Sequence, residues 1–211
     1  MVGFPLPRLY AIADAGLLAS RALPLPAFAA SLREAGVTLI QWRDKQSSAA
    51  SILASATLLR GIFPPEETLL LLNDHPALAA QSHCDGVHLG QDDLAPAAAR
   101  LLLPSPRLIG LSTHTLDQVV AASHTSADYL ALGPIFATSS KPDASPVVGL
   151  DLLRRARGLT SKPIVAIGGI TRHNAPSVLA AGADSLAVIS ALLPPHEPTA
   201  NVVRDFLDLF R

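Results

Sequence analysis

Short apolar segments recur along the chain, and each is followed by a stretch rich in alanine and leucine. The segments are about four to six residues long, and most show no alternation of apolar and polar positions. Unbroken apolar runs of this length are typical of parallel strands covered on both faces. The pattern predicts eight strands, at Arg8–Ala13, Thr38–Trp42, Thr68–Leu72, Gly86–Leu89, Arg107–Leu111, Tyr129–Leu132, Pro163–Ile167 and Ser185–Ile189.

The segments between these strands carry helix signals. Thr115 and Gln118 form a capping-box pattern, and glycine follows several of the segments, as at Gly36, Gly158 and Gly182. Pro76 and Pro96 stand where short helices can begin. The pattern predicts longer helices over Pro26–Ala35, Ser47–Leu59, Leu116–Ser123, Leu150–Arg157, His173–Ala181 and Asn201–Phe210.

Eight strand–helix units in 211 residues predict one domain, spanning residues 1–211, with the α/β fold of a (β/α)8 TIM barrel. A doubly wound open sheet is the structural alternative. That fold usually has a glycine-rich turn after its first strand, and Asp14-Ala-Gly16 does not match such a turn. We therefore favour the closed barrel.

Polar residues and glycines gather at the carboxyl ends of the predicted strands, where a barrel of this kind carries its active site. Few such clusters occur in the loops at the opposite end. The clusters are Gln41 to Lys45, Asn73 and Asp74, Gly90 to Asp93, Ser112 to Thr115, Thr138 to Lys141, Gly168 and Gly169, and Ile189 and Ser190.

The residue types in these clusters indicate phosphate-bearing ligands and a metal ion. Arg43, Lys45 and Lys141 supply three cations, and arginine and lysine both bind phosphate. Asp74 and Asp93 follow adjacent strands, and paired carboxylates suit Mg²⁺.

A second phosphate site is predicted after the last two strands. Gly168-Gly169 and Ile189-Ser190 stand there, and many barrels hold a monophosphate on backbone N–H groups at that place.

Structural roles remain open for several of these residues. Asp74 and Asp93 could each cap the helix that begins near the following proline. Arg43 and Lys45 could pair with Asp44. His88 lies inside a predicted strand, where a packed core histidine is the commoner case.

Composition excludes several classes of partner. The formal net charge is −1 and only 16% of residues are charged, so nothing indicates binding to nucleic acid or to a membrane surface. Cys84 is the only cysteine, and we expect it to pack as a small apolar residue. Without a clear signal peptide or a long apolar segment, a cytoplasmic location is expected.

Six motifs follow one another along the chain. They are Gln41-Trp-Arg-Asp-Lys45, Asn73-Asp74, Asp85-Gly-Val-His-Leu-Gly-Gln-Asp-Asp93, Ser112-Thr-His-Thr115, Gly133-Pro-Ile-Phe136 with Thr138 to Lys141, and Ile167-Gly-Gly-Ile170. In this order and combination, the motifs resemble those of the thiamin phosphate synthase family, and the resemblance spans roughly Leu9 to Leu192.

The resemblance implies a transferase that joins 4-amino-2-methyl-5-(diphosphooxymethyl)pyrimidine to 4-methyl-5-(2-phosphooxyethyl)thiazole with the help of Mg²⁺. It assigns the metal to Asp74 and Asp93, and catalysis to Arg43, Lys45, Ser112 and Lys141. The pyrimidine diphosphate would contact Gln41, Arg43, Lys45, Asn73, Ser112 and Lys141. The thiazole phosphate would contact Thr138, Ser140, Gly169, Ile189 and Ser190.

The resemblance is also compatible with a homo-oligomer. Two departures from the family pattern are small: Trp42 is bulkier than expected and is predicted to point away from the pocket, and Ser140 replaces a common threonine. The segment Ala137–Val148 is expected to form a long loop whose closure would exclude water.

Other functions are conceivable on the same barrel. A thiazole tautomerase-like relative would lack the full metal and diphosphate set, which Asn73, Asp74, Asp93 and Lys141 complete here. A sugar-phosphate or tryptophan-pathway isomerase would not need these carboxylates, and a sensor would bind thiamin precursors without turnover.

Overall fold

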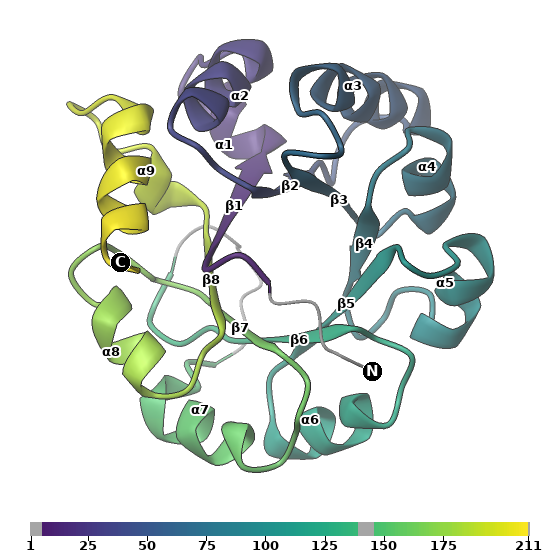
Figure 1. Cartoon of the computed structure of the whole chain (residues 1–211), viewed down its shortest axis with the longest axis vertical. Helices are drawn as coiled ribbons and strands as arrows, with labels where there is room; N and C mark the ends of the chain where they lie inside the picture. Colours follow the sequence, from purple (N-terminus) through teal and green to yellow (C-terminus); the bar gives the residue numbers. More distant parts are fainter. Residues whose placement is uncertain (1–5, 139–145, 211) are drawn as a thin grey trace.

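Eight parallel strands close into a barrel in chain order (Figure 1). The computed structural model describes residues 6–138 and 146–210. The last strand pairs with the first, so the closed barrel is confirmed and the open sheet is excluded. The strands are β1 Leu9–Asp14, β2 Leu39–Arg43, β3 Leu69–Asn73, β4 Gly86–Leu89, β5 Leu108–Thr113, β6 Tyr129–Leu132, β7 Ile164–Ile167 and β8 Ser185–Val188.

Helices form a ring around the strands (Figure 1). Within the described residues, none of them is both long and apolar enough to cross a membrane. They are α1 Ala15–Ser20, α2 Leu25–Glu34, α3 Ala49–Ile62, α4 Pro76–Gln81, α5 Pro96–Leu102, α6 Leu116–Ser123, α7 Gly149–Arg157, α8 Ala175–Ala180 and α9 Thr199–Asp208, with a short 3₁₀ helix η1 at Ser190–Leu192.

Helix ends follow the local signals with two differences. Thr115 caps α6 by accepting from the Gln118 N–H, but the Gln118 side chain accepts from His114 N–H and not from the capping residue itself. Gly36 and Gly182 adopt the left-handed conformation that suits glycine after a helix, whereas Gly158 stays right-handed. The sequence did not predict α1, which begins because Asp14 caps it at Leu17 N–H.

Side chains alternate along each strand between the barrel interior and the layer beneath the helices. Tyr10 and Ile12 of β1 face the interior, while Leu9, Ala11 and Ala13 pack in the outer layer. Trp42 belongs to the outer layer, so the prediction that it points away from the pocket is confirmed.

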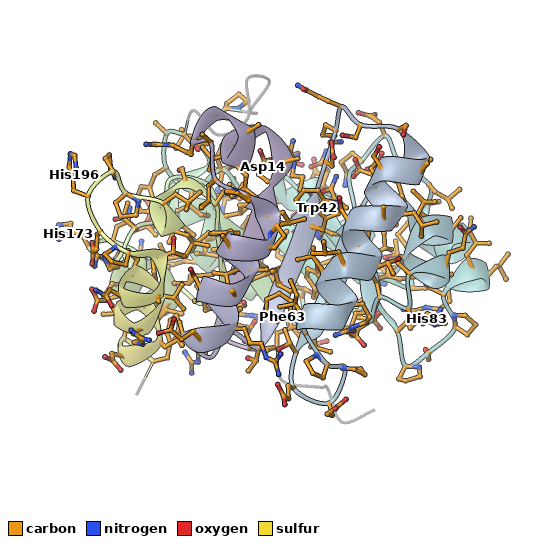
Figure 2. The ribbon with its side chains drawn as sticks, turned by 90° about the horizontal axis from the view of Figure 1, so that it is seen from above. Asp14, Trp42, Phe63, His83, His173 and His196 are labelled. Carbon is orange, nitrogen blue, oxygen red and sulfur yellow. The ribbon has the colours of Figure 1, made fainter. Side chains whose placement is uncertain are left out.

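The two ends of the barrel differ in content. Asp14 lies at the carboxyl end of β1, and Phe63 lies at the opposite end, just before β3 (Figure 2). The buried apolar side chains fill the body of the barrel between these ends, and Cys84 packs among them as expected.

A repeated arginine–aspartate clamp joins neighbouring strands at the amino end. In the first clamp, Asp85 Oδ2 accepts the Leu70 N–H at 2.7 Å and Arg60 Nη1 at 2.6 Å. Arg60 also donates to the Phe63 and Thr68 carbonyls, which belong to the connection between α3 and β3.

The same arrangement occurs twice more, one pair of strands further along each time. Asp128 accepts the Ile109 N–H at 2.7 Å and pairs with Arg100. Asp184 accepts the Ile164 N–H at 2.7 Å and pairs with Arg157. Each aspartate precedes an even-numbered strand and bonds to the odd-numbered strand before it, so the clamps fix the register of three strand pairs.

We expect Asp85→Ala to lower the free energy of unfolding by about 2–4 kcal/mol. The variant leaves the Leu70 N–H without its acceptor and the largely buried Arg60 without its counter-ion. Urea denaturation measures the change.

Asp151→Ala is the matched control, because its pair with Arg154 has side chains 95% and 56% exposed. We expect a change within about 0.5 kcal/mol for this variant. Equal midpoints for the two variants would contradict a clamping role for Asp85.

Candidate active site

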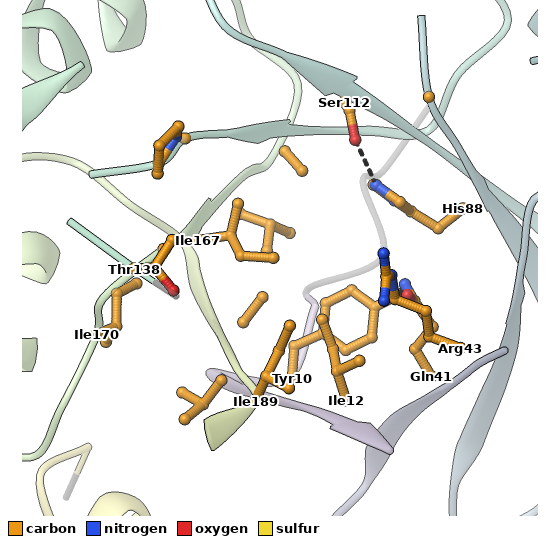
Figure 3. A pocket seen from close by; sticks show the side chains of 18 of the residues that line it. Tyr10, Ile12, Gln41, Arg43, His88, Ser112, Thr138, Ile167, Ile170 and Ile189 are labelled. Atoms are coloured by element: carbon orange, nitrogen blue, oxygen red, sulfur yellow. Dashed lines mark hydrogen bonds between the residues drawn. The ribbon is translucent and has the colours of Figure 1, made fainter. Parts of the chain in front are cut away.

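A cavity of about 690 Å³ opens at the carboxyl ends of the strands (Figure 3). Its deeper walls include apolar side chains such as Ile12, Val165 and Ala187. The cavity is large enough for a drug-sized organic ligand.

Most of the residues predicted for the site line this cavity. They are Gln41, Arg43, Lys45, Asn73, Ser112, Thr138, Gly169, Ile189 and Ser190. Asp74 and Asp93 stand beside it and are connected to it through Lys45. Ser140, Lys141 and most of the Ala137–Val148 segment lie outside the described residues.

Gln41 and Arg43 reach the cavity because they share the inward face of β2. The Arg43 guanidinium pairs with Asp14, which follows from the register of β1 against β2. The prediction that Arg43 could pair with Asp44 is wrong, because the Asp44 carboxylate accepts the backbone N–H groups of Gln46 and Ser47.

Two donors at the cavity remain without acceptors among the described residues. Arg43 Nε and Asn73 Nδ2 are both buried and make no hydrogen bond there. Buried donors of this kind normally have a partner, so their arrangement favours a bound acceptor such as a phosphate oxygen.

Asp74 and Asp93 form a carboxyl pair beside Lys45. Burial raises the pKa of Asp74, and contact with Asp93 raises it further, although the ion pair with Lys45 opposes this. Burial also acts to raise the pKa of Asp93, but its hydrogen bonds with Asp74 and with the Gly90 N–H outweigh that effect and lower it. Two carboxylates in contact repel each other when both are charged, and a bound divalent cation would relieve that repulsion.

The capping roles considered for the two aspartates are wrong. The N-cap residues of α4 and α5 are His75 and Ala95, and neither makes a side-chain capping bond within the described part of the chain. Asp74 instead has a φ of 61°, a left-handed conformation that is uncommon outside glycine and costs free energy. Its N–H donates to the His88 carbonyl at 2.8 Å, which holds this conformation at the rim.

Gly168 and Gly169 are required by the path of the neighbouring loop. A Cβ at Gly168 would lie 2.4 Å from Pro134 Cβ, and one at Gly169 would lie 2.6 Å from the Ala137 carbonyl oxygen. Both glycines also have positive φ. The close approach leaves backbone N–H groups next to Thr138, where an anion could bind.

A chain of hydrogen bonds crosses the floor of the cavity. Gln41 Nε2 donates to the Tyr10 hydroxyl at 2.6 Å, and the Tyr10 and Tyr129 hydroxyls are 3.0 Å apart. His88 Nδ1 lies 3.0 Å from the Tyr129 hydroxyl and its Nε2 lies 2.9 Å from Ser112 Oγ (Figure 3 shows this last bond). His88 therefore lines the site, contrary to the core role that its position in a strand had favoured.

Sequence reasoning missed several residues that shape the site. Tyr10 resembles an ordinary strand residue, whereas Asp14 directly follows the predicted strand Arg8–Ala13, at the carboxyl end where the other polar clusters gather. Gln91 was likewise not singled out, although its side chain donates to the Ser112 carbonyl.

His114 belongs to the predicted cluster from Ser112 to Thr115. It lines the cavity and hydrogen-bonds through Nδ1 to the Gly133 carbonyl at 2.6 Å. This contact connects the end of β5 to the segment that follows β6.

The closed barrel and the polar cavity at its carboxyl end define a (β/α)8-barrel enzyme. The chain belongs to the thiamine monophosphate synthase family, whose model matches residues 9–192.

Individual relatives agree with this assignment. The chain is 54% identical over 193 residues to the thiamine-phosphate synthase of Koribacter versatilis (strain Ellin345), with 90% of this chain and 91% of the relative covered. It is 44% identical over 192 residues to that of Methanocella arvoryzae (strain DSM 22066 / NBRC 105507 / MRE50), with 91% and 90% covered.

Solved structures are also similar. The thiamine phosphate pyrophosphorylase from Pyrococcus furiosus superposes with a TM-score of 0.83 at 31% identity, covering 96% of this chain and 94% of that one. A native KDPGal structure at 16% identity and a TM-score of 0.71, covering 99% and 96%, shares the fold.

We expect neither tyrosine to ionise before the protein unfolds in alkali. Burial raises the pKa of both phenols above the ordinary 10.0, so the folded state holds their protons. The stabilising effect is complete below the ordinary pKa and is lost as the pH rises above it, because only the unfolded chain then releases the protons.

The absorbance of tyrosinate, followed along a pH series together with circular dichroism, checks this. Tyr10 and Tyr129 are the only tyrosines, so the signal belongs to them alone. Tyrosinate absorbance in a sample that keeps its native circular dichroism would contradict the expectation.

Proposed function

We propose that the chain is a thiamine-phosphate synthase that joins 4-amino-2-methyl-5-(diphosphooxymethyl)pyrimidine to 4-methyl-5-(2-phosphooxyethyl)thiazole. The thiazole nitrogen forms a bond to the pyrimidine methylene carbon, the bond from that carbon to the diphosphate oxygen breaks, and thiamine phosphate and diphosphate result. Family membership supports the overall activity. The cavity carries the finer proposal, because its rim combines cations with a carboxyl pair.

The diphosphate is proposed to bind at Arg43 and Lys45, with Lys141 as a third cation. Arg43 Nε and Asn73 Nδ2 support this, because both are buried, have no acceptor within residues 6–138 and 146–210, and so offer a hydrogen bond to an anionic oxygen. Asp14 contacts the Arg43 guanidinium and so restricts its position. Charge that develops on the departing diphosphate would be stabilised by these fixed cations.

The residues at the rim fit a Mg²⁺ ion held by Asp74 and Asp93. No described residues form a cluster of three or more histidine, cysteine, aspartate or glutamate side chains, so two carboxylates would leave other positions for water and substrate oxygens. Contact between the carboxyl groups of Asp74 and Asp93 supports a shared cation. When bound, Mg²⁺ would neutralise negative charge on the diphosphate.

The pyrimidine ring is proposed to lie deeper, against Gln41 and Ser112. Electron donation from its 4-amino group can stabilise positive charge at the methylene carbon, so a dissociative displacement is chemically reasonable. The thiazole nitrogen already carries a lone pair, and the displacement therefore needs no general base.

The thiazole phosphate is proposed to bind Thr138 and Ser140 together with backbone N–H groups at Gly169, Ile189 and Ser190. The tight turn at Gly168 and Gly169 supports an anion at this place. Holding this phosphate would orient the nucleophilic nitrogen toward the methylene carbon.

The alternatives lack a supporting observation. A thiazole tautomerase-like barrel or a sensor without turnover has no use for a carboxyl pair next to Lys45.

We expect purified protein to form thiamine phosphate from the two precursors with Mg²⁺, and to lose that activity with excess chelator. Asp74→Asn and Asp93→Asn should each lower kcat/KM roughly 100- to 1000-fold, because each removes one carboxylate of the proposed metal site. Product formation is measured by mass spectrometry.

Asp117→Asn is the control, because Asp117 is an exposed acid at the start of α6, at the same end of the barrel. We expect its activity to stay within about twofold of the parent. Absence of product from folded parent protein would refute the activity, and full activity in chelator would refute the metal site.

A further inference from the structure

The hydrogen-bond chain beneath the cavity connects two residues that the proposed function assigns to the pyrimidine. It runs from Gln41 through Tyr10, Tyr129 and His88 to Ser112. These residues come from five strands, and the two tyrosines and the histidine connect Gln41 at one end of the hydrogen-bond chain to Ser112 at the other. The ends are therefore coupled through side chains that need not touch the ligand.

The amide of Gln41 sets the direction of the chain. Its nitrogen donates to the Tyr10 oxygen, which leaves the Tyr10 O–H to donate onward, and the Tyr129 hydroxyl lies within reach as the acceptor. In that direction the Tyr129 O–H would donate to His88 Nδ1, and a neutral imidazole that accepts at Nδ1 carries its proton on Nε2.

This direction determines what each end offers. In this direction His88 Nε2 would donate to Ser112 Oγ at 2.9 Å, so the serine's own proton would not be used within the hydrogen-bond chain. At the other end, the Gln41 amide oxygen accepts no hydrogen bond from the described residues, and Gln41 lines the cavity. One end thus presents an acceptor and the other a donor.

Packing holds the chain in place. The rings of Tyr10 and Tyr129 meet edge to face with centroids 6.1 Å apart, and His88 stacks on Tyr129 at 5.7 Å. Gly110 on β5 makes room for Tyr129, because a Cβ there would lie 2.1 Å from Tyr129 Cζ. Burial keeps both phenols neutral, since it raises the pKa of each.

We propose that Tyr10 and Tyr129 are positioning residues. They transmit the orientation of the Gln41 amide to His88 and hold His88 as its Nε2–H tautomer. As a result, Ser112 is presented to the ligand as a hydrogen-bond donor and Gln41 as an acceptor. This rests on the proposed function for the identity of the ligand. A ring with an amino donor and a ring-nitrogen acceptor, as in a 4-aminopyrimidine, matches the pattern.

Nitrogen-15 NMR of the protein without ligand tests the chain directly, with the His88 signals assigned by their loss in His88→Gln. In the parent protein we expect a single tautomer protonated at Nε2. Tyr129→Phe should give a mixture of tautomers. Tyr10→Phe should do the same, although Tyr10 does not contact His88 in the hydrogen-bond chain, because the link to the Gln41 amide is then broken.

Gln41→Glu is a sharper test. A carboxylate in place of the amide accepts from Tyr10, which reverses every bond along the chain and should place the proton on His88 Nδ1. Ser185→Ala is the matched control: it removes another buried hydroxyl, whose hydrogen bond goes to the Pro7 carbonyl and not to the chain, and should leave the tautomer unchanged.

Kinetics provide the functional readout. We expect Tyr10→Phe and Tyr129→Phe each to raise KM for the pyrimidine diphosphate about tenfold, with KM for the thiazole phosphate changed less than about twofold. The double variant should also show about a tenfold rise, because residues that act as one unit are not additive, whereas independent residues would give about a hundredfold.

An Nδ1–H tautomer in the parent protein would overturn the proposal without any variant, so it stays testable if a variant fails to fold. An unchanged tautomer in Tyr10→Phe, or a hundredfold effect in the double variant, would also overturn it. Turnover by the parent protein decides the proposed function separately, because the tautomer is measured without substrate.

Discussion

A closed barrel of short parallel strands gives each strand only two or three inward positions, and the rest of the site depends on that constraint. Gln41 and Arg43 share the inward face of β2, so one strand delivers an amide to the floor and a guanidinium to the rim. The register of β1 against β2 sets Asp14 beside Arg43. A slip of one residue would exchange Gln41 for Trp42 and destroy the floor, so strand register is a functional requirement.

The two ends of the barrel divide stability and chemistry between them. At the amino end, Asp85, Asp128 and Asp184 each satisfy a backbone N–H and an arginine, and these clamps hold the register. At the carboxyl end, Arg43 Nε is buried without a hydrogen-bond partner among the residues that the structure describes, and Asp74 adopts a left-handed conformation. Such costs are typical of functional sites, where groups are arranged for a ligand and not for the empty fold.

Sequence patterns predicted the eight strands to within one or two residues, because short apolar runs between helix signals leave little choice. They could not show which side chains face inward, since both faces of such strands are apolar, and so Tyr10 and Tyr129 were not recognised as part of the site. Asp14 was missed because its pairing with Arg43 depends on a contact between two strands, and its local capping of α1 was not recognised. Asp74 and Asp93 were recognised by type, but only the structure shows their mutual contact.

The floor and the rim of the cavity differ in charge: neutral phenols lie at the floor, and charged side chains lie at the rim. The floor carries phenols, an imidazole and an amide, and burial there opposes ionisation of both tyrosines. Lys45 stands at the rim with about half of its side chain exposed, where solvent reduces the cost of charge. A ligand with a neutral ring and an anionic tail therefore has one favourable orientation, with the ring inward and the phosphates at the rim. In the proposed reaction, that orientation would place the leaving group next to the cations, while neutral phenols and an amide lie beneath the ring.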